Sequence, residues 1–351
     1  TKYSDGLGLP SDAYAYARTK AGLDFLAITE HNHSMAAGSD GITIAKSPAL
    51  YSSSDPASLT SAAKKATVAG KFVALYGQEY STNNNGNQVN VFDAPKVIAV
   101  PNGDYPGLVA WLENNPDSTG ASPIVQFNHP RGLPEFGSDK FGNEAAWIAK
   151  MDAATSLINL INGPGNKDGT GLDSAKPSEL RYKSYLGLGF HVAPTADQDN
   201  HFQNWGAATN ARTGVLASSL TKQAILQGLR LGRAYASEDK NLRVLAWIQQ
   251  RLAGGSTTIP APGAELKIAV RLMDADEPAA RYDIGIYTGK IGGPLAKAIG
   301  NASAAGNTPD GKVFAVKGLS YEPGTDYMYL VVTQRDATDP DRVWLAPVWF
   351  K

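Results

Sequence analysis

The stretch Asp24-Phe-Leu-Ala-Ile-Thr-Glu-His-Asn-His-Ser34 decides the fold that we expect for this chain. Its apolar run, Phe25 to Ile28, is hydrophobic on both faces, which is typical of a strand buried in a parallel sheet. Glu30, His31 and His33 follow directly, where α/β folds place their active-site side chains. A carboxylate and two imidazoles there indicate a metal site, although a loop with solvated histidines fits this stretch equally well.

The same order of apolar strand and polar cluster recurs along the chain. Three further runs end in such clusters: Phe72–Tyr76 before Gly77-Gln78-Glu79, Pro123–Phe127 before Asn128-His129-Pro130-Arg131, and Gly189–Val192 before the polar run to His201. Segments with helical composition lie between these runs. The alternation of strand and helix predicts a parallel α/β architecture, and a barrel of the TIM-barrel type in particular.

The pattern changes near residue 242. Six short runs with alternating apolar residues follow, at 242–247, 266–271, 282–287, 313–316, 327–333 and 343–349, and turns of Gly, Pro and Asp separate them. Such runs without intervening helices predict an antiparallel β-sandwich. We therefore expect two domains, a barrel over residues 1–241 and an all-β accessory sandwich over residues 242–351.

Composition narrows the classes of protein. The 32 basic and 33 acidic residues nearly cancel, so bulk charge gives no reason to expect a nucleic-acid partner. No apolar run is long enough to cross a bilayer. The chain has no cysteine, which excludes disulfides, thiolate catalysis and cysteine-bound zinc. A cysteine-free chain rich in Asn, Gly and Ser suits the periplasm or the cell exterior, where we expect this protein.

Four of the five histidines follow a predicted strand and lie near a carboxylate or an asparagine: His31, His33, His129 and His201. His191 instead lies inside an apolar strand, which is more typical of a core residue. Imidazole and carboxylate are the usual ligands of catalytic zinc, manganese or iron. A bound metal lowers the pKa of its water toward about 7, so that hydroxide becomes available as a nucleophile.

The polar clusters resemble the motifs of the polymerase-and-histidinol-phosphatase (PHP) metallohydrolases, and most closely those of the subgroup that includes carbaryl hydrolases. That family opens with His-x-His followed by Thr-x-x-Ser-Asp-Gly, and this chain starts with Thr1-Lys-Tyr-Ser-Asp5-Gly6. Four later segments are similar to family motifs in the same order: Thr29-Glu30-His31-Asn32, Gly77-Gln-Glu79, Asn128-His129-Pro130 and Asp199-Asn-His201. The likeness covers residues 1 to about 240.

The resemblance implies a distorted (β/α)7 barrel that holds two or three divalent metal ions, of zinc, manganese or iron. Position by position, it implies six metal ligands, with Glu79 bridging two metals: Asp5, His31, Glu79, His129, Asp199 and His201. Glu30, Gln88 and Asn128 would support the ligands, and Gln88 stands where many relatives have a further histidine. The His-x-His pair is expected upstream of Thr1. Asp5 has a plainer alternative role, as a turn residue.

Three side chains are candidates for handling the substrate. Arg131 and Arg212 can hold an anionic substrate or stabilise negative charge in the transition state. The alternative for each arginine is a salt bridge with Glu135 or another carboxylate. His33 can reach the substrate, support a ligand or remain solvated.

Three functions remain open at this stage. The first is a metal-dependent hydrolase, a phosphoesterase that acts on a small-molecule or anionic ester through a metal-bound hydroxide. Carboxyl-ester or carbamate hydrolysis at the same site is a variant of it. The second is a non-catalytic binding or surface protein on a decayed PHP barrel, and the third, nucleic-acid processing, is disfavoured by the neutral charge. The sequence does not determine the oligomeric state.

Overall fold

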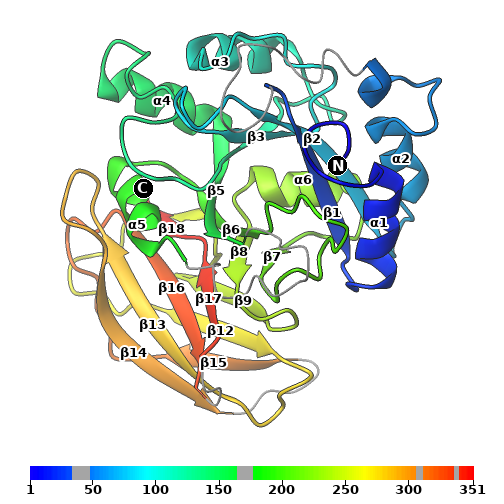
Figure 1. Cartoon of the computed structure of the whole chain (residues 1–351). Helices are drawn as coiled ribbons and strands as arrows, with labels where there is room; N and C mark the ends of the chain where they lie inside the picture. The colour runs from blue at the N-terminus through cyan, green and yellow to red at the C-terminus, as the bar shows by residue number, and fades with distance from the viewer. Residues whose placement is uncertain (34–47, 164–176, 306–310, 336–339) are drawn as a thin grey trace. The chain divides into compact units, whose positions relative to one another are not determined.

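The computed structural model describes residues 1–33, 48–163, 177–305, 311–335 and 340–351 (Figure 1). The chain packs into two compact units. The N-terminal unit consists of residues 1–178, 198–209 and 217–230, and the β-rich unit consists of residues 179–197, 210–216 and 231–351. Each unit is thus assembled from three separate segments of the chain. The division into domains at residues 241 and 242 stays a prediction.

The N-terminal unit is built on the strands β1 to β5, with helices between them. Its elements are α1 (Pro10–Thr19), β1 (Phe25–His31), the 3₁₀ turn η2 (Pro48–Tyr51), α2 (Leu59–Ala66), β2 (Val73–Tyr80), β3 (Val89–Phe92), α3 (Tyr105–Asn114), β4 (Ile124–Phe127), α4 (Glu144–Ala154), β5 (Thr155–Asn162) and α6 (Lys222–Arg230). These five strands pair in chain order. β1 pairs with β2 in parallel, β4 pairs with β5 in parallel, and β3 is antiparallel to both of its neighbours.

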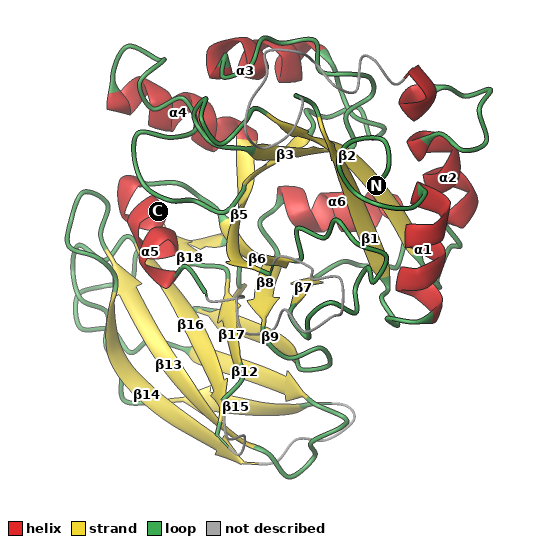
Figure 2. Ribbon diagram, in the orientation of Figure 1, coloured by secondary structure: helices red, strands yellow, loops and turns green. Residues whose placement is uncertain are grey.

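Helices α1 and α2 pack beside each other against β1 and β2 (Figure 2). The core there includes Tyr14, Leu59 and Phe72, all fully buried. The Tyr14 hydroxyl donates to the carbonyl of Leu75 at 2.7 Å, which satisfies its one polar atom inside this core. The apolar runs that the sequence shows are therefore what holds the carboxyl ends of β1 and β2 in place.

The β-rich unit contains one helix and most of the strands. Its elements are α5 (Glu179–Leu188), β6 (Ala193–Asp197), β7 (Arg212–Val215), β8 (Ala234–Ser237), β9 (Arg243–Ile248), β10 (Arg251–Leu252), β11 (Ser256–Thr257), β12 (Ile268–Met273), β13 (Arg281–Gly289), β14 (Lys297–Ala305), β15 (Lys312–Val316), β16 (Tyr327–Gln334), β17 (Arg342–Leu345) and β18 (Val348–Phe350). One sheet has the order β10-β9-β12-β15. The other has the order β11-β18-β16-β17-β8-β7, and β13 joins it through β16 and also pairs with β14.

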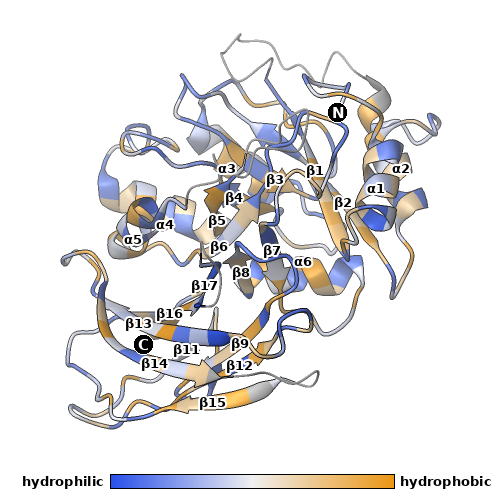
Figure 3. Ribbon diagram, turned by 60° about the horizontal axis from the view of Figure 1, so that its bottom comes forward, coloured by the Kyte–Doolittle hydropathy of each residue, from blue (hydrophilic) through white to orange (hydrophobic). Residues whose placement is uncertain are grey.

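The alternation of apolar residues along these strands gives the unit its core. Alternate residues of β12 (Ile268, Val270, Leu272) and of β13 (Tyr282, Ile284, Ile286) are buried in one apolar cluster. Orange residues mark the apolar positions of β12 in Figure 3. Alternate residues point to opposite faces of a strand, so one face of each sheet lies in the core and the other is more polar.

The predicted fold, a (β/α)7 barrel of the PHP or TIM-barrel type followed by a sandwich, is wrong. The described part of the chain has only six α-helices, and β3 breaks the parallel order of the first sheet. The reason lies in the connection from Tyr80 to Val89, which is too short for the crossover of a dozen or more residues that a parallel pair needs. The sandwich is not self-contained either, because β7 and β8, from before residue 242, belong to one of its sheets.

Among the helices that the structure describes, none combines the length and the apolar character needed to span a membrane.

Candidate metal centre

Five side chains of the N-terminal unit form a row in which imidazoles and carboxylates alternate. Asp5 lies between His201 and His31, with 3.2 Å from each Nε2 to one of its two carboxylate oxygens. Glu79 lies between His31 and His129, 3.0 Å from Nδ1 of His31 and 3.8 Å from Nε2 of His129. The structure thus brings five of the six predicted metal ligands into one row, and the sixth, Asp199, lies 3.9 Å from Nδ1 of His201.

The sheet explains how two of these groups meet. His31 ends β1, and its register partner in the parallel strand β2 is Glu79. Because neighbouring parallel strands end at one edge of a sheet, the two side chains emerge side by side. Asp5 belongs to the loop before α1, which is joined to the His201 loop by a hydrogen bond from the Leu7 N–H to the His201 carbonyl at 2.8 Å.

The nitrogens of His31 and His201 are used in the same way. Nδ1 of His201 lies 3.0 Å from the carbonyl oxygen of Asp199, and Nδ1 of His31 lies 3.0 Å from the Glu79 carboxylate. A carbonyl or an ionised carboxylate can only accept, so each Nδ1 carries a hydrogen. Both Nε2 atoms face Asp5. This is the arrangement in which proteins hold a metal-binding histidine, with the outer nitrogen fixed by an acceptor.

Attraction between the carboxylates and the imidazoles of this row shifts their pKa values. Burial disfavours the charged form of Asp5, but hydrogen bonds to His201 and His31 outweigh it and hold the pKa of Asp5 well below its usual range. Burial likewise opposes charge on His31, and Asp5 with Glu79 nevertheless raises the pKa of His31 to about 10. The bond to Asp5 raises the pKa of His201 to about 9. Burial also opposes charge on Glu79, but hydrogen bonds to His129 and His31 hold the pKa of Glu79 well below its usual range, so Asp5 and Glu79 are both ionised at neutral pH.

The donor set fits a divalent cation. Ligand atoms of Asp5, His31 and His201 all lie within 4.8 Å of one another. Two ligands about 2.0–2.1 Å from a tetrahedral zinc ion are separated by roughly 3.3 Å, close to the 3.2 Å spacings from Asp5 to each histidine. Nδ1 of His129 is buried and has no hydrogen-bond partner among the described residues. This nitrogen is therefore available as a further metal ligand at the His129 end of the row.

Amide side chains hold Glu79 and the ring of His31. Asn128 donates to Glu79 at 2.7 Å, and Gln126 donates in turn to the side-chain oxygen of Asn128 at 3.0 Å. The Gln88 amide lies 3.2 Å from Nδ1 of His31. Sequence reasoning missed Gln126, although a polar residue inside the apolar strand β4 was a signal that it faces something polar.

Glu30 is almost fully buried, and it supports the loop of Asp5 rather than a histidine. Its carboxylate accepts hydrogen bonds from the hydroxyls of Thr1 and Ser4. The loop is thereby anchored to β1, next to His31.

Asn87 is a second residue that sequence reasoning missed. Its amide donates to the carbonyl of Asn128 at 3.2 Å and to the Glu135 carboxylate at 3.0 Å. Glu135 also accepts from the backbone N–H groups of Arg131 and Gly132. His129 has a φ of 28°, an uncommon value for a residue with a side chain, and these contacts hold the turn that contains it.

Asp199, the sixth predicted ligand, is exposed and lies beside the row: its carboxylate is 3.9 Å from Nδ1 of His201 and accepts a hydrogen bond from Asn162 at 3.2 Å. The remaining candidates lie in different surroundings. His33 is fully buried, with its ring edge-on to Tyr80. Arg131 has an exposed side chain, and its positive charge acts on His129. Arg212 belongs to the β-rich unit, where its guanidinium donates to the carbonyl of Ala211.

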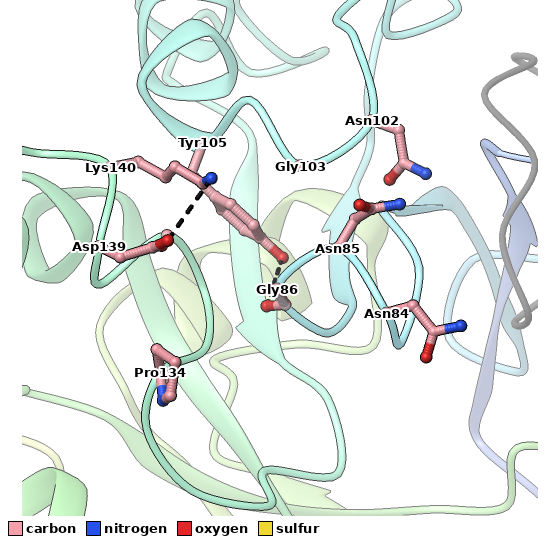
Figure 4. Close-up of a pocket in the computed structure, with 10 residues that line it drawn as sticks. Asn84, Asn85, Gly86, Asn102, Gly103, Tyr105, Pro134, Asp139 and Lys140 are labelled. Atoms are coloured by element: carbon pink, nitrogen blue, oxygen red, sulfur yellow. Dashed lines mark hydrogen bonds and ion pairs between the residues drawn. The ribbon is translucent and has the colours of Figure 1, made fainter.

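A polar pocket of about 250 Å³ lies in the N-terminal unit (Figure 4). Asn84, Asn85 and Asn102 line it together with Tyr105 and the ion pair of Asp139 and Lys140. The Tyr105 hydroxyl donates to the carbonyl of Gly86, the residue before Asn87. The pocket wall is therefore continuous with the turn of His129.

Comparisons with known proteins do not assign a family. The sequence matches no protein-family model and no curated protein. Among solved structures, a weak match is a β-glucosidase from Erythrobacter marinus, with 10% identity and a TM-score of 0.18, which is too low to indicate a shared fold. The match covers 93% of this chain and 45% of the glucosidase, so the chain spans less than half the length of that protein.

Proposed function

We propose that this protein is a metal-dependent hydrolase that cleaves phosphate esters, as the PHP metallohydrolases that its motifs resemble do. One observation carries the proposal: Nδ1 of His31 and of His201 is each held by an acceptor, while both Nε2 atoms face Asp5. Asp5, His31 and His201 would hold one divalent cation. Zinc, manganese and iron suit this mixture of imidazole and carboxylate.

A second cation would be held at the other end of the row. Glu79 offers an oxygen toward His129, and the charge of Asp199 also acts on His129. Glu79 would then support both cation sites, because one of its oxygens lies toward His31 and the other toward His129. In this proposal Asn128 holds the Glu79 carboxylate in a fixed orientation, because the Asn128 amide donates a hydrogen bond to Oε1 of Glu79.

The charges near His129 favour a phosphate ester over a neutral ester. Arg131 is exposed, and its positive charge is close enough to lower the pKa of His129 against the stronger effect of Glu79. A guanidinium at the rim can pair with phosphate oxygens of an entering substrate. Divalent cations, when bound, polarise the phosphoryl oxygen and make water more acidic. The amide-lined pocket beside the His129 turn would take the alcohol part of the ester.

The test is metal analysis of the purified full chain, combined with assays on four aryl substrates. These are an aryl phosphate monoester, a phosphate diester, an aryl acetate and an aryl carbamate. We expect about one or two divalent ions per chain, and turnover of at least one phosphate ester that is lost in His31→Ala. Glu113→Gln, at an exposed position of α3, is the control for general effects of substitution.

Three results would decide between the alternatives. Turnover of the acetate or carbamate without any phosphate ester would replace the phosphoesterase by a carboxyl-ester or carbamate hydrolase. Absence of both metal and turnover would favour a non-catalytic binding protein. Unchanged metal content and activity in His31→Ala would refute the site itself.

A further inference from the structure

The β-rich unit contains a second cluster of acidic side chains, at one end of its two sheets. Ligand atoms of Asp239, Asp274 and Glu277 lie within 4.8 Å of one another. Asp239 follows β8, and Asp274 follows β12. Asp239 and Asp274 are buried, whereas Glu277 is exposed. Burying two neighbouring carboxylates is unfavourable unless positive charge or hydrogen bonds compensate them.

Backbone and side-chain groups of the protein donate hydrogen bonds to this cluster. Asp239 accepts from the backbone N–H groups of Asn241 and Leu242, both through Oδ1. Asp274 accepts from the Asn241 amide at 2.9 Å and from the Tyr282 hydroxyl at 2.6 Å. The positive charge of Arg212 acts on Asp239 as well. Asp274 also accepts from the backbone N–H of Glu277 at 3.2 Å.

Gln334, at the end of β16, supplies a neutral oxygen on the sheet face from which Tyr282 contacts the cluster. Gln334 is 5% exposed, and its Oε1 is buried without a hydrogen-bond partner among the described residues. Gln334 is the register partner of Tyr282 across β16 and β13, so both side chains rise from the same face of the sheet. The Tyr282 hydroxyl reaches Asp274, so the neighbour of Gln334 on this face contacts the cluster directly.

The sheet register also places Gln334 toward Asp239. The Gln334 N–H donates to the carbonyl of Asp341, and the next residue of that strand, Arg342, accepts from the N–H of Glu238. Asp239 follows Glu238 directly. The row across the sheet therefore runs from Tyr282 through Gln334 and Asp341 toward Asp239. At one end of this row Tyr282 contacts the acidic cluster, and at the other end Asp239 belongs to it.

We propose that Asp239, Asp274, Glu277 and the side-chain oxygen of Gln334 form a calcium site. All four groups offer oxygen atoms only, and two or three carboxylates with one amide carbonyl are the ligands that calcium prefers. Histidine is not part of this set, which distinguishes it from the imidazole-rich row in the N-terminal unit. The ion joins the end of β8 to the end of β12, and so ties one sheet of the unit to the other.

Terbium luminescence tests this assignment, because Tb³⁺ occupies calcium sites and a nearby phenol sensitises it. The chelator-treated full chain is titrated with Tb³⁺ under excitation of tyrosine, and calcium is then added as competitor. Tyr282 is hydrogen-bonded to Asp274, so we expect a luminescence signal that calcium removes. Calcium should also raise the unfolding temperature of the chelated chain.

Two matched variants locate the site. Glu277→Gln removes one ligand at an exposed position, so it should leave the fold intact and weaken calcium binding by about tenfold or more. Asp276→Asn changes the same charge in the same exposed loop but lies outside the cluster, and it should bind calcium like the wild type. His31→Ala should also leave the signal unchanged.

Any of three results would overturn the proposal. The first is a chelated chain without terbium signal that calcium displaces. The second is an equal effect of Glu277→Gln and Asp276→Asn. The third is displacement of terbium by magnesium as readily as by calcium, which would reject calcium as the ion.

Discussion

His31 and Glu79 are register partners at the carboxyl ends of the parallel strands β1 and β2, and Nδ1 of His31 lies 3.0 Å from Oε2 of Glu79. The backbone pairing of β1 and β2 therefore places these two side chains next to each other. The carboxylate orients the imidazole, so that Nε2 points to Asp5. A rigid sheet edge thus supplies the preorganisation that a metal site needs.

Glu79→Gln tests this orientation. The amide has nearly the same shape as the carboxylate but lacks its charge, so it is a weaker acceptor for the hydrogen on Nδ1 of His31. We expect metal affinity to fall by about 10–100-fold, measured by competition with a chromophoric chelator. Glu113→Gln should bind metal like the wild type. Unchanged affinity in Glu79→Gln would show that this contact does not support a metal ligand.

Local patterns in the sequence predicted the edge of the sheet but not its topology. The apolar run before His31 and the one before Glu79 are observed as β1 and β2, paired in parallel. Side chains at the end of such strands must emerge together, so short motifs were enough to predict that His31 and Glu79 would meet. The role of this cluster as a metal site stays a prediction.

The predicted barrel is wrong because the prediction did not consider the length of the connection between β2 and β3. Tyr80 and Val89 are separated by too few residues for a helical crossover, so β3 returns antiparallel to β2. That reversal also explains Gln88. It precedes β3 and therefore lies at the same edge as the ends of β1 and β2, where its amide approaches His31. The contacts of Gln126 and Asn87 depend on tertiary packing that no local pattern specifies.

The stability of the metal-free protein should fall in alkaline solution. His31 has a pKa raised from 6.5 to about 10, and His201 has one raised from 6.5 to about 9. Groups with a raised pKa stabilise the folded state fully below their unfolded pKa, and this contribution is lost as the pH rises through the folded value. Urea unfolding of the chelated chain should therefore show decreasing stability from about pH 6.5 to pH 10.

Two comparisons isolate the cause of this decrease. His31→Asn should show a flatter dependence on pH over the same range. The metal-loaded protein should also show a flatter dependence, because the cation replaces the protons between the carboxylates. Equal slopes for the chelated wild type and His31→Asn would contradict the assignment of this dependence to His31.

Gly77→Ala should destabilise the protein through the backbone of β3. An added Cβ at Gly77 would lie 2.4 Å from the carbonyl oxygen of Val91, which cannot move without shifting the strand. We expect the free energy of unfolding to fall by about 1–3 kcal/mol. Gly187→Ala, where an added Cβ meets nothing within 4 Å, should stay within about 1 kcal/mol of the wild type. Equal stability of the two variants in urea would refute the steric argument.

Asn87→Gly tests whether the turn of His129 must be held from outside. Asn87 has a φ of 70°, which glycine adopts without strain, so the substitution removes the amide and leaves the backbone relaxed. The carbonyl of Asn128 and the Glu135 carboxylate each lose a donor, which should cost about 1–3 kcal/mol of stability. Metal bound at the His129 end should be lost first.

The control for this change is Asn114→Ala, because that amide donates to the carbonyl of Ala110 within α3, at an exposed position. It should leave metal content and unfolding in urea unchanged. Asn87 contacts the backbone carbonyls of Asn128 and His129 and not the His129 ring. A loss of metal in Asn87→Gly would therefore show that turn geometry, and not ligand chemistry alone, limits binding. Full metal content in a destabilised Asn87→Gly would instead assign Asn87 a purely structural role.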